Sequence, residues 1–215
     1  MTGRVIHIVD DEAPVRASLA FMLVSAGFTV KAHANARAFL AESWKPDEVC
    51  LLTDLRMPDM DGLELLTELR RRGIDAPSIV LTGHGDVPMA VAAMKAGASD
   101  FIEKPYSEAT IIDAIHAACA RFDAHSKNGL SIAPTDIRHR LRQLTSRERE
   151  ILEGVVAGLP NKTIAYDLEI SPRTVEAHRA SIMAKMQARS LPELVRMTLA
   201  VDLSAEKGDP DRDRN

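Results

Sequence analysis

The sequence has little cysteine and no long hydrophobic run. Its 215 residues include only Cys50, in a strand-like apolar segment, and Cys119, in a helix-like one. Two single thiols in such segments are typical of small buried side chains in a reducing compartment, which argues against a disulfide framework. No apolar run approaches the roughly 20 residues that span a bilayer, and the N-terminal MTGRVIHIVDDE lacks a signal-peptide pattern. We therefore expect a cytoplasmic protein.

Net charge is also small, at −4, but it is unevenly distributed. Residues 1–125 contain 12 Lys/Arg and 18 Asp/Glu, a balance of −6, whereas residues 137–203 contain 11 and 8, a balance of +3. This asymmetry indicates two units with different partners. The small positive excess of the second unit favours nucleic-acid binding without establishing it.

The first 125 residues alternate between short apolar runs of strand length and helix-like segments. Runs such as VIHIV fit strands buried on both faces, and Gly27, Gly73 and Gly97 follow helical patterns, where left-handed caps are expected. The pattern predicts an α/β fold, a doubly wound five-stranded parallel (βα)5 domain. The predicted strands are Val5–Val9, Phe28–Val30, Val49–Leu52, Ile79–Leu81 and Asp100–Ile102, and the predicted helices are Pro14–Ser25, Ala34–Leu40, Gly62–Arg72, Val87–Ala96 and Ser107–Phe122.

The back half predicts a small all-α domain from its helix starts. Thr145–Glu148 and Ser190–Glu193 are capping boxes, Ser171 precedes a proline in the first helical position, and Asn161 can cap a short helix. Asp136 can cap a linker helix with an apolar face formed by Ile137, Leu141 and Leu144. The expected divisions are residues 1–122, a partly helical linker 123–144, a domain 145–203 with helices 146–157, 162–168, 172–187 and 191–201, and a disordered tail 204–215.

Five polar residues end or follow predicted strands: Asp10, Asp11, Asp54, Thr82 and Lys104. The carboxyl ends of parallel strands meet at one edge of the sheet, so these side chains should lie together. Clustered carboxylates favour a hard divalent ion such as Mg²⁺ (or Mn²⁺). Asp54 could then attack a phosphoryl group while Lys104 and the Thr82 hydroxyl bind its oxygens. A single Asp at the end of a strand is usually a turn or cap residue. The four segments VDDE, TDLRMPDMDG, LTGHGD and DFIEKP, in this order on alternating strands and helices, together predict a phosphoacceptor site.

On these segments, residues 4 to about 122 resemble the receiver domain of two-component response regulators. The resemblance implies that a sensor histidine kinase phosphorylates Asp54. It also implies a metal site formed by Asp10, Asp11, Asp54 and the backbone carbonyl of Arg56, and a cis peptide bond between Lys104 and Pro105.

The same resemblance implies that Thr82 and Phe101 form a switch, although Phe101 can equally be an ordinary core aromatic. His84, between two glycines, is either a solvated loop residue or one that influences dephosphorylation.

The stretch NKTIAYDLEISPRTVEAHRASIMAKM contains two helices joined by a short turn, the helix-turn-helix arrangement. Residues 138–203 resemble the LuxR-type (NarL/FixJ) DNA-binding domain, which implies that the second helix enters the major groove. Glu176 can either accept a hydrogen bond from the amino group of cytosine or lie on a solvent-exposed face of the helix. The last helix either packs in the core or pairs with its twin on DNA. The implied DNA-binding residues are Lys162, Thr163, Arg173, Thr174, Glu176, Ala177, His178, Arg179, Ala180 and Lys185.

Within this family, both domains most resemble the nitrogen-fixation regulators, through the stretches SLAFML, TDLRMPDMDG, TGHGDVPMAV, FIEKP, AGLPNKTIAYDL and MTLA. This resemblance implies a transcriptional activator of nitrogen-fixation genes at low oxygen, with a FixL-like kinase that senses oxygen through haem. It also implies homodimerisation on phosphorylation, binding to promoter double-stranded DNA and contact with RNA polymerase. The resemblance implies no enzyme, although the receiver would support Mg²⁺-dependent self-phosphorylation and self-dephosphorylation at Asp54. Two alternatives remain. A haloacid-dehalogenase-type phosphatase would need a second Asp where Arg56 stands, and a regulator sensing an acyl signal would leave the acid cluster without a purpose.

Overall fold

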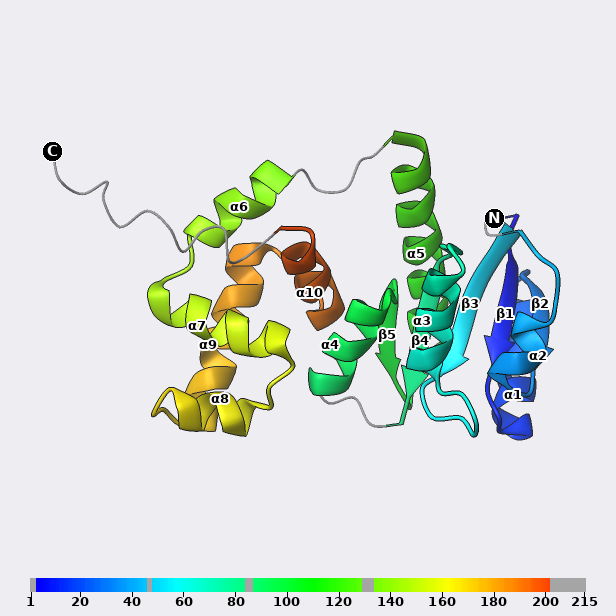
Figure 1. Ribbon diagram of the computed structural model, residues 1–215, viewed down its shortest axis with the longest axis horizontal. Helices are drawn as coiled ribbons and strands as arrows, with labels where there is room; N and C mark the ends of the chain where they lie inside the picture. Colours follow the sequence, from blue (N-terminus) through cyan, green and yellow to red (C-terminus); the bar gives the residue numbers. More distant parts are fainter. Residues whose placement is uncertain (1–2, 46–47, 84–86, 129–133, 202–215) are drawn as a thin grey trace, which may run out of the picture. The chain divides into compact units, whose positions relative to one another are not determined.

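The computed structural model describes residues 3–45, 48–83, 87–128 and 134–201 (Figure 1). It divides into two compact units, Met1–Leu130 and Ser131–Asn215. The first combines strands and helices, and the second is helical in its described part. The division falls within residues 123–144, where we expect the linker.

A five-stranded parallel sheet with the order β2-β1-β3-β4-β5 forms the centre of the first unit, which confirms the predicted fold. The strand order reverses between β1 and β3, so a crevice is expected beyond the carboxyl ends of these strands. The strands are β1 (Val5–Val9), β2 (Thr29–His33), β3 (Val49–Asp54), β4 (Ser78–Thr82) and β5 (Asp100–Glu103).

In the described part of this unit, five helices connect and cover these strands. Asp61 and Glu64 form a capping box at the start of α3, and Gly27, Gly73 and Gly97 have positive φ angles, as predicted. The helices are α1 (Ala13–Ser25), α2 (Ala36–Leu40), α3 (Gly62–Arg71), α4 (Val87–Ala96) and α5 (Glu108–Asn128).

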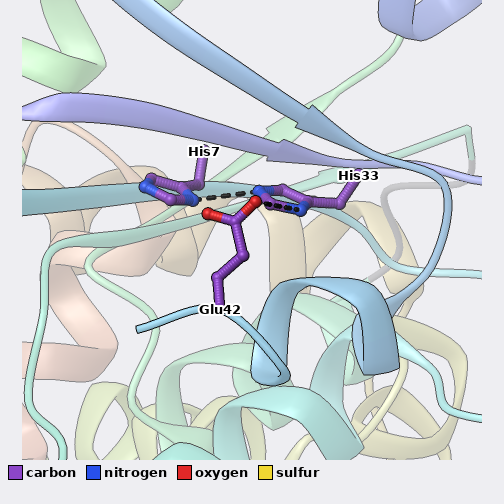
Figure 2. A group of neighbouring side chains, drawn as sticks. All are labelled: His7, His33 and Glu42. Atoms are coloured by element: carbon purple, nitrogen blue, oxygen red, sulfur yellow. Dashed lines mark hydrogen bonds and ion pairs between the residues drawn. The ribbon is translucent and has the colours of Figure 1, made fainter. Parts of the chain in front are cut away.

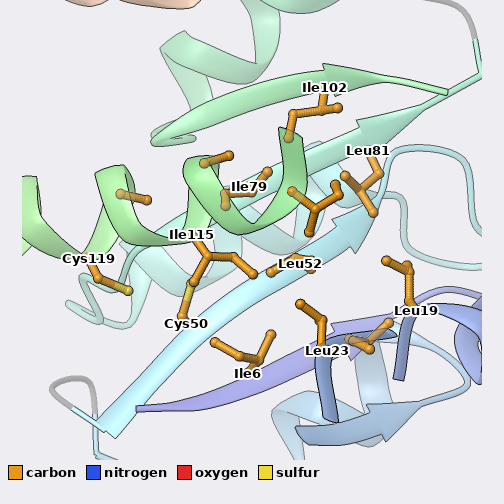
Figure 3. Close-up of a cluster of buried hydrophobic side chains, with 14 residues drawn as sticks. Ile6, Leu19, Leu23, Cys50, Leu52, Ile79, Leu81, Ile102, Ile115 and Cys119 are labelled. Carbon is orange, nitrogen blue, oxygen red and sulfur yellow. The ribbon is translucent and has the colours of Figure 1, made fainter. Parts of the chain in front are cut away.

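The main hydrophobic cluster lies between the sheet and two helices, α1 and α5 (Figure 3). Leu23 of α1 and Ile115 of α5 are fully buried against residues such as Leu52 of β3. The other face carries α2, where the Phe39 ring lies 5.3 Å from that of His7. All six residues of β3 are buried, because helices cover both faces of the sheet.

All four strands after β1, and also helix α5, end later than predicted, and the differences are largest for β2 and α5. Strand β2 continues to His33; its exposed edge residues, including Lys31, interrupt the apolar run on which the prediction relied. Helix α5 continues to Asn128, beyond the predicted end at Phe122.

Among the described residues of the second unit, α9 contacts α6, α7, α8 and α10. Its buried residues are Val175, Ile182 and Met186, the apolar face that the sequence predicts. The capping box of Thr145 and Glu148 and the cap formed by Ser171 are also confirmed. The helices are α6 (Pro134–Arg142), α7 (Ser146–Ala157), α8 (Asn161–Asp167), α9 (Pro172–Met186) and α10 (Leu191–Leu199).

Two predicted caps in this unit are wrong. Asn161 is the first residue of α8, and its side-chain oxygen accepts a hydrogen bond from Arg179 of α9 at 2.8 Å instead. Asp136 lies in the first turn of α6, because the helix already begins at Pro134. The predicted buried face of Ile137, Leu141 and Leu144 is nevertheless confirmed.

The expected tail 204–215 and His84 lie outside the described residues. Within the described residues, every helix is too short or too polar to span a bilayer.

Candidate functional site

The predicted acid cluster forms at the carboxyl edge of the sheet. Asp54 is the last residue of β3 and Thr82 the last of β4, while Asp10 follows β1 and Lys104 follows β5. These strands are neighbours, so residues far apart in the chain meet at one edge. The peptide bond between Lys104 and Pro105 is cis, as the resemblance implies.

The amine of Lys104 joins two of the carboxylates. Its Nζ lies 2.5 Å from Asp54 Oδ1 and 3.2 Å from Asp10 Oδ2. Burial alone would lower the pKa of this amine, but its hydrogen bonds to both carboxylates and their negative charges raise the pKa above its usual value. Lys104 therefore remains charged at neutral pH and offsets part of the repulsion between the two acids.

Backbone amides bind the remaining carboxylate oxygens. Asp10 Oδ1 accepts from the amide of Glu12, and Asp54 Oδ2 accepts from the amide of Arg56, each at 2.8 Å. Asp10 and Asp54 are 1% and 8% exposed. Because both carboxylates are buried and bound on two sides, their orientations are fixed before any ligand arrives.

The other predicted site residues differ in their burial. Asp11 is exposed next to Asp10, Thr82 is buried and Phe101 is half-buried. The backbone amide of Lys104 donates to the carbonyl of Thr82 at 2.7 Å, which connects the end of β4 to the residue after β5. Arg16, which the sequence did not single out, donates to the Asp10 carbonyl at 2.6 Å.

The donor set fits a small hard cation. Asp10, Asp11 and Asp54 supply only oxygen atoms, and the exposed side of Asp11 leaves room for waters. Mg²⁺ typically uses one or two carboxylates together with waters and a phosphate oxygen.

The helix-turn-helix unit exposes the second predicted surface. After α8, Glu169 adopts a left-handed conformation (φ 54°) and the amide of Ile170 donates to the carbonyl of Ala165 at 2.9 Å, so the chain reverses within a few residues. On α9, the residues predicted to face bases are exposed, as are two predicted phosphate contacts on α8. These exposed residues are Arg173, Glu176, Ala177, Ala180, Lys162 and Thr163.

Glu148 of α7 holds this surface in place. It is only 4% exposed and accepts hydrogen bonds from Ser181 and Lys185 of α9, both at 2.7 Å. Lys185, which the resemblance implies as a DNA contact, is therefore paired with an acid, and Arg179 is bonded to Asn161. The sequence indicated only the local capping role of Glu148.

Comparison with known proteins agrees with the acid cluster of the first unit and with the helix-turn-helix of the second. The response regulator receiver domain family matches residues 6–116, and the luxR family of bacterial regulatory proteins matches residues 142–198. The chain belongs to the two-component response regulators with a LuxR-type DNA-binding domain. This response regulator is a phosphorylation-controlled DNA-binding transcriptional regulator and not an enzyme of the phosphatase type.

Individual relatives cover nearly the whole response regulator. Transcriptional regulatory protein FixJ of Rhizobium meliloti (strain 1021) is 60% identical over 205 residues, 93% of this chain and 97% of the relative. The protein of the same name from Azorhizobium caulinodans is 53% identical over 90% of this chain and 91% of its own length. Full-length FixJ from B. japonicum, a crystal structure, is 43% identical with a TM-score of 0.53, covering 93% and 97% of the two chains. These relatives therefore match both domains of this chain, in the same order along the sequence.

Proposed function

We propose that Asp54 accepts a phosphoryl group from a sensor histidine kinase of the FixL type. The observation that carries this proposal is the position of Asp54, buried at the end of β3 and bonded to Lys104. A carboxylate held in this way is ready for in-line attack on phosphorus, which gives an acyl phosphate at Asp54 and releases the kinase histidine.

Lys104 and Thr82 then bind the oxygens of the new phosphoryl group. Lys104 already lies within hydrogen-bond distance of Asp54, so its amine needs only a small movement to reach an oxygen of the acyl phosphate. Asp10, Asp11, Asp54 and the carbonyl of Arg56 would hold Mg²⁺ (or Mn²⁺), which supplies further charge neutralisation when bound.

The charge that phosphorylation adds changes the conformation of the receiver domain. Phosphorylation adds about −1.5 to −2 charges at Asp54, next to the buried Thr82. Thr82 moves towards the phosphoryl group, Phe101 follows into the space that it leaves, and the surface of α4 and β5 changes. Two phosphorylated receivers pair through this surface, so that two DNA-binding domains address two half-sites of one promoter.

Contacts with the promoter double-stranded DNA come from α8 and α9. Glu176, Ala177 and Ala180 face base edges, with Arg173 at the start of the recognition helix. Phosphate contacts come from Lys162, Thr163, Thr174 and His178. Arg179 and Lys185, which are bonded within the domain, position α9 and add positive charge.

Nitrogen-fixation genes are the proposed target, activated with RNA polymerase when oxygen is low. Support comes from the resemblance in both domains and from the name FixJ carried by relatives that are 60% and 53% identical. Oxygen sensing itself belongs to the kinase in this proposal.

The test is promoter binding and oligomeric state of the full chain, with and without beryllofluoride and Mg²⁺, for wild type and Asp54→Asn. We expect the phosphoryl mimic to dimerise the wild type and strengthen promoter binding, and to leave Asp54→Asn unchanged. If Asp54→Asn dimerises on the same addition, the assignment of Asp54 is wrong. If the wild type binds the promoter equally as a monomer, the dimerisation step is wrong.

A further inference from the structure

A second group of ionisable side chains lies on the α2 side of the sheet, away from the hydrophobic cluster of α1 and α5. His7 of β1 and His33 at the end of β2 lie side by side, with His7 Nδ1 3.0 Å from His33 Nε2 (Figure 2). The two rings are parallel to within 4°, with centroids 5.1 Å apart. Both residues are buried, at 2% and 5% exposure, and neither takes part in the phosphoacceptor site.

Glu42, which follows α2, completes the group from the solvent side. Its Oε1 lies 3.9 Å from His33 Nδ1, while its Oε2 accepts a hydrogen bond from Lys31 at 2.9 Å. The carboxylate points towards the two imidazoles (Figure 2). One possible ligand atom from each of the three residues lies within 4.8 Å of the others.

The surroundings favour uncharged imidazoles. Burial, and after it the neighbouring His33, lowers the pKa of His7 from 6.5 to about 4, although the charge of Glu42 acts in the opposite direction. Burial also lowers the pKa of His33. At neutral pH both rings are therefore neutral, the form that binds metals. The hydrogen bond between His7 Nδ1 and His33 Nε2 contains a single proton. If the ring that donates this proton changes to its other tautomer, the proton moves to the second nitrogen of the same ring. Both His7 Nδ1 and His33 Nε2 then present a lone pair, and no proton is released.

We propose that His7, His33 and Glu42 form a binding site for a divalent transition-metal ion of the Zn²⁺ class. Two imidazoles and one carboxylate, with a fourth position open to water, form a common protein ligand set for Zn²⁺. With metal–ligand distances of about 2.1 Å, tetrahedral ligands lie about 3.4 Å apart. The two histidine nitrogens are already near that separation, at 3.0 Å.

Binding requires each imidazole to turn so that its lone pair meets the ion, and it requires the carboxylate of Glu42 to move closer. Glu42 is 37% exposed, so rotation of its side chain brings Oε1 to the ion without disturbing the core, while Lys31 keeps its bond to Oε2. On the inner side, the rings of Phe39 and Trp44 lie 5.3 and 6.3 Å from that of His7. These apolar walls limit solvent to the side of Glu42.

This site differs in chemistry from the acid cluster of Asp10, Asp11 and Asp54. Imidazole nitrogens select Zn²⁺, Co²⁺, Ni²⁺ or Cu²⁺, whereas an all-oxygen set suits Mg²⁺ and Mn²⁺. Mg²⁺ in excess can therefore occupy the acid cluster while a transition metal is added to the other site.

The test is a titration of the full chain with Co²⁺ in excess Mg²⁺, followed by visible absorption. Tetrahedral Co²⁺ with nitrogen ligands absorbs strongly, and octahedral Co²⁺ with oxygen ligands absorbs weakly. We expect one strong site per wild-type chain, displaced by Zn²⁺. Glu42→Gln should weaken it by at least about tenfold. The matched control, Glu48→Gln, changes an exposed acid that pairs with Lys45, and should bind like wild type.

His33→Gln provides a second variant, with circular dichroism to verify folding, and we expect it to lose the strong absorption. If the wild type shows no strong absorption, the site does not exist. If Glu42→Gln binds like wild type, the absorption comes from other histidines and the assignment is wrong. Either result leaves the proposed role of Asp54 untouched, because that proposal rests on the burial of Asp54 and its bond to Lys104.

Discussion

The amine of Lys104 lies 2.5 Å from Oδ1 of Asp54, although 50 residues separate the two in the chain. The contact connects the end of β3 to the loop after β5, and the same amine lies 3.2 Å from Oδ2 of Asp10, which follows β1. Phosphorylation must break or rearrange this contact, because the oxygen that accepts it belongs to the proposed phosphoacceptor.

Lys104→Ala should slow phosphorylation of Asp54 without unfolding the first unit. Removal of the amine removes a positive charge that stabilises the phosphoryl oxygens, and loss of one such group typically costs about 10²-fold in rate or more. The rate of labelling by a small acyl-phosphate donor, followed by mass spectrometry, measures the effect. Lys95→Ala, on the exposed end of α4, is the matched control. Wild-type labelling of Lys104→Ala would contradict the proposed role.

Gly62→Ala should destabilise the first unit and disturb the site together. A Cβ at this position would lie 2.4 Å from the backbone carbonyl oxygen of Asp54, so either α3 or the end of β3 must move. We expect a loss of about 1–3 kcal/mol in unfolding free energy, the usual cost of overpacking, with slower phosphorylation. Chemical denaturation measures the first effect. Gly3→Ala is the control, because nothing lies within 4 Å of its new Cβ. Equal stability of the two variants would show that the contact is tolerated.

Glu148→Gln should destabilise the DNA-binding unit at neutral pH. Burial by itself raises the pKa of Glu148, but the hydrogen bonds from Lys185, Ser181 and Thr145 together lower the pKa from 4.5 to about 2. With allowance for the partial exposure of Lys185, the loss should be about 2 kcal/mol. Thermal unfolding of this unit measures it. Glu150→Gln, an exposed acid of the same helix, should have little effect.

The same carboxylate predicts a pH dependence. Because its folded-state pKa lies below its unfolded value, its stabilisation is fully present above pH 4.5 and is lost as the pH falls through about 2. The difference in unfolding free energy between wild type and Glu148→Gln should therefore shrink over this window. A difference that stays constant down to pH 2 would assign the effect to packing and not to charge.

Lys162→Ala should weaken DNA binding in a salt-dependent and sequence-independent way. Lys162 is exposed at the start of α8, where we propose a phosphate contact. Loss of one such contact should reduce the slope of log affinity against log salt by about 0.9. Binding of promoter and unrelated duplexes at several salt concentrations measures it. Arg142→Ala, an exposed cation on α6, should leave the slope unchanged.

The local features of this protein could be predicted from the sequence. Strand β1 spans Val5–Val9 as predicted, and the capping box of Thr145 and Glu148 forms as its spacing indicates. Such features depend on neighbours within one or two turns of chain, so the residues that decide them are contiguous. The strand-end position of Asp54 follows in the same way, because apolar runs and turn residues delimit the strand.

Other features depended on packing between distant segments. Asn161 fits the cap pattern, yet it bonds to Arg179, because α9 lies close enough to compete for its side chain. The sequence indicates only a local capping role for Glu148, and its hydrogen bond with Lys185 forms because α7 packs on α9. His7 stands out in VIHIV as one polar residue, but nothing in its neighbours indicates His33.

By itself, then, the sequence determined the parallel (βα)5 fold, the helix-turn-helix unit and the acids at one sheet edge. The tertiary structure alone decided that Lys104 bonds both Asp10 and Asp54, and that His7 meets His33 and Glu42. The physical reason is that periodicity and capping act over a few residues, whereas the distance between two side chains from separate strands is set by strand register and helix packing across the whole unit.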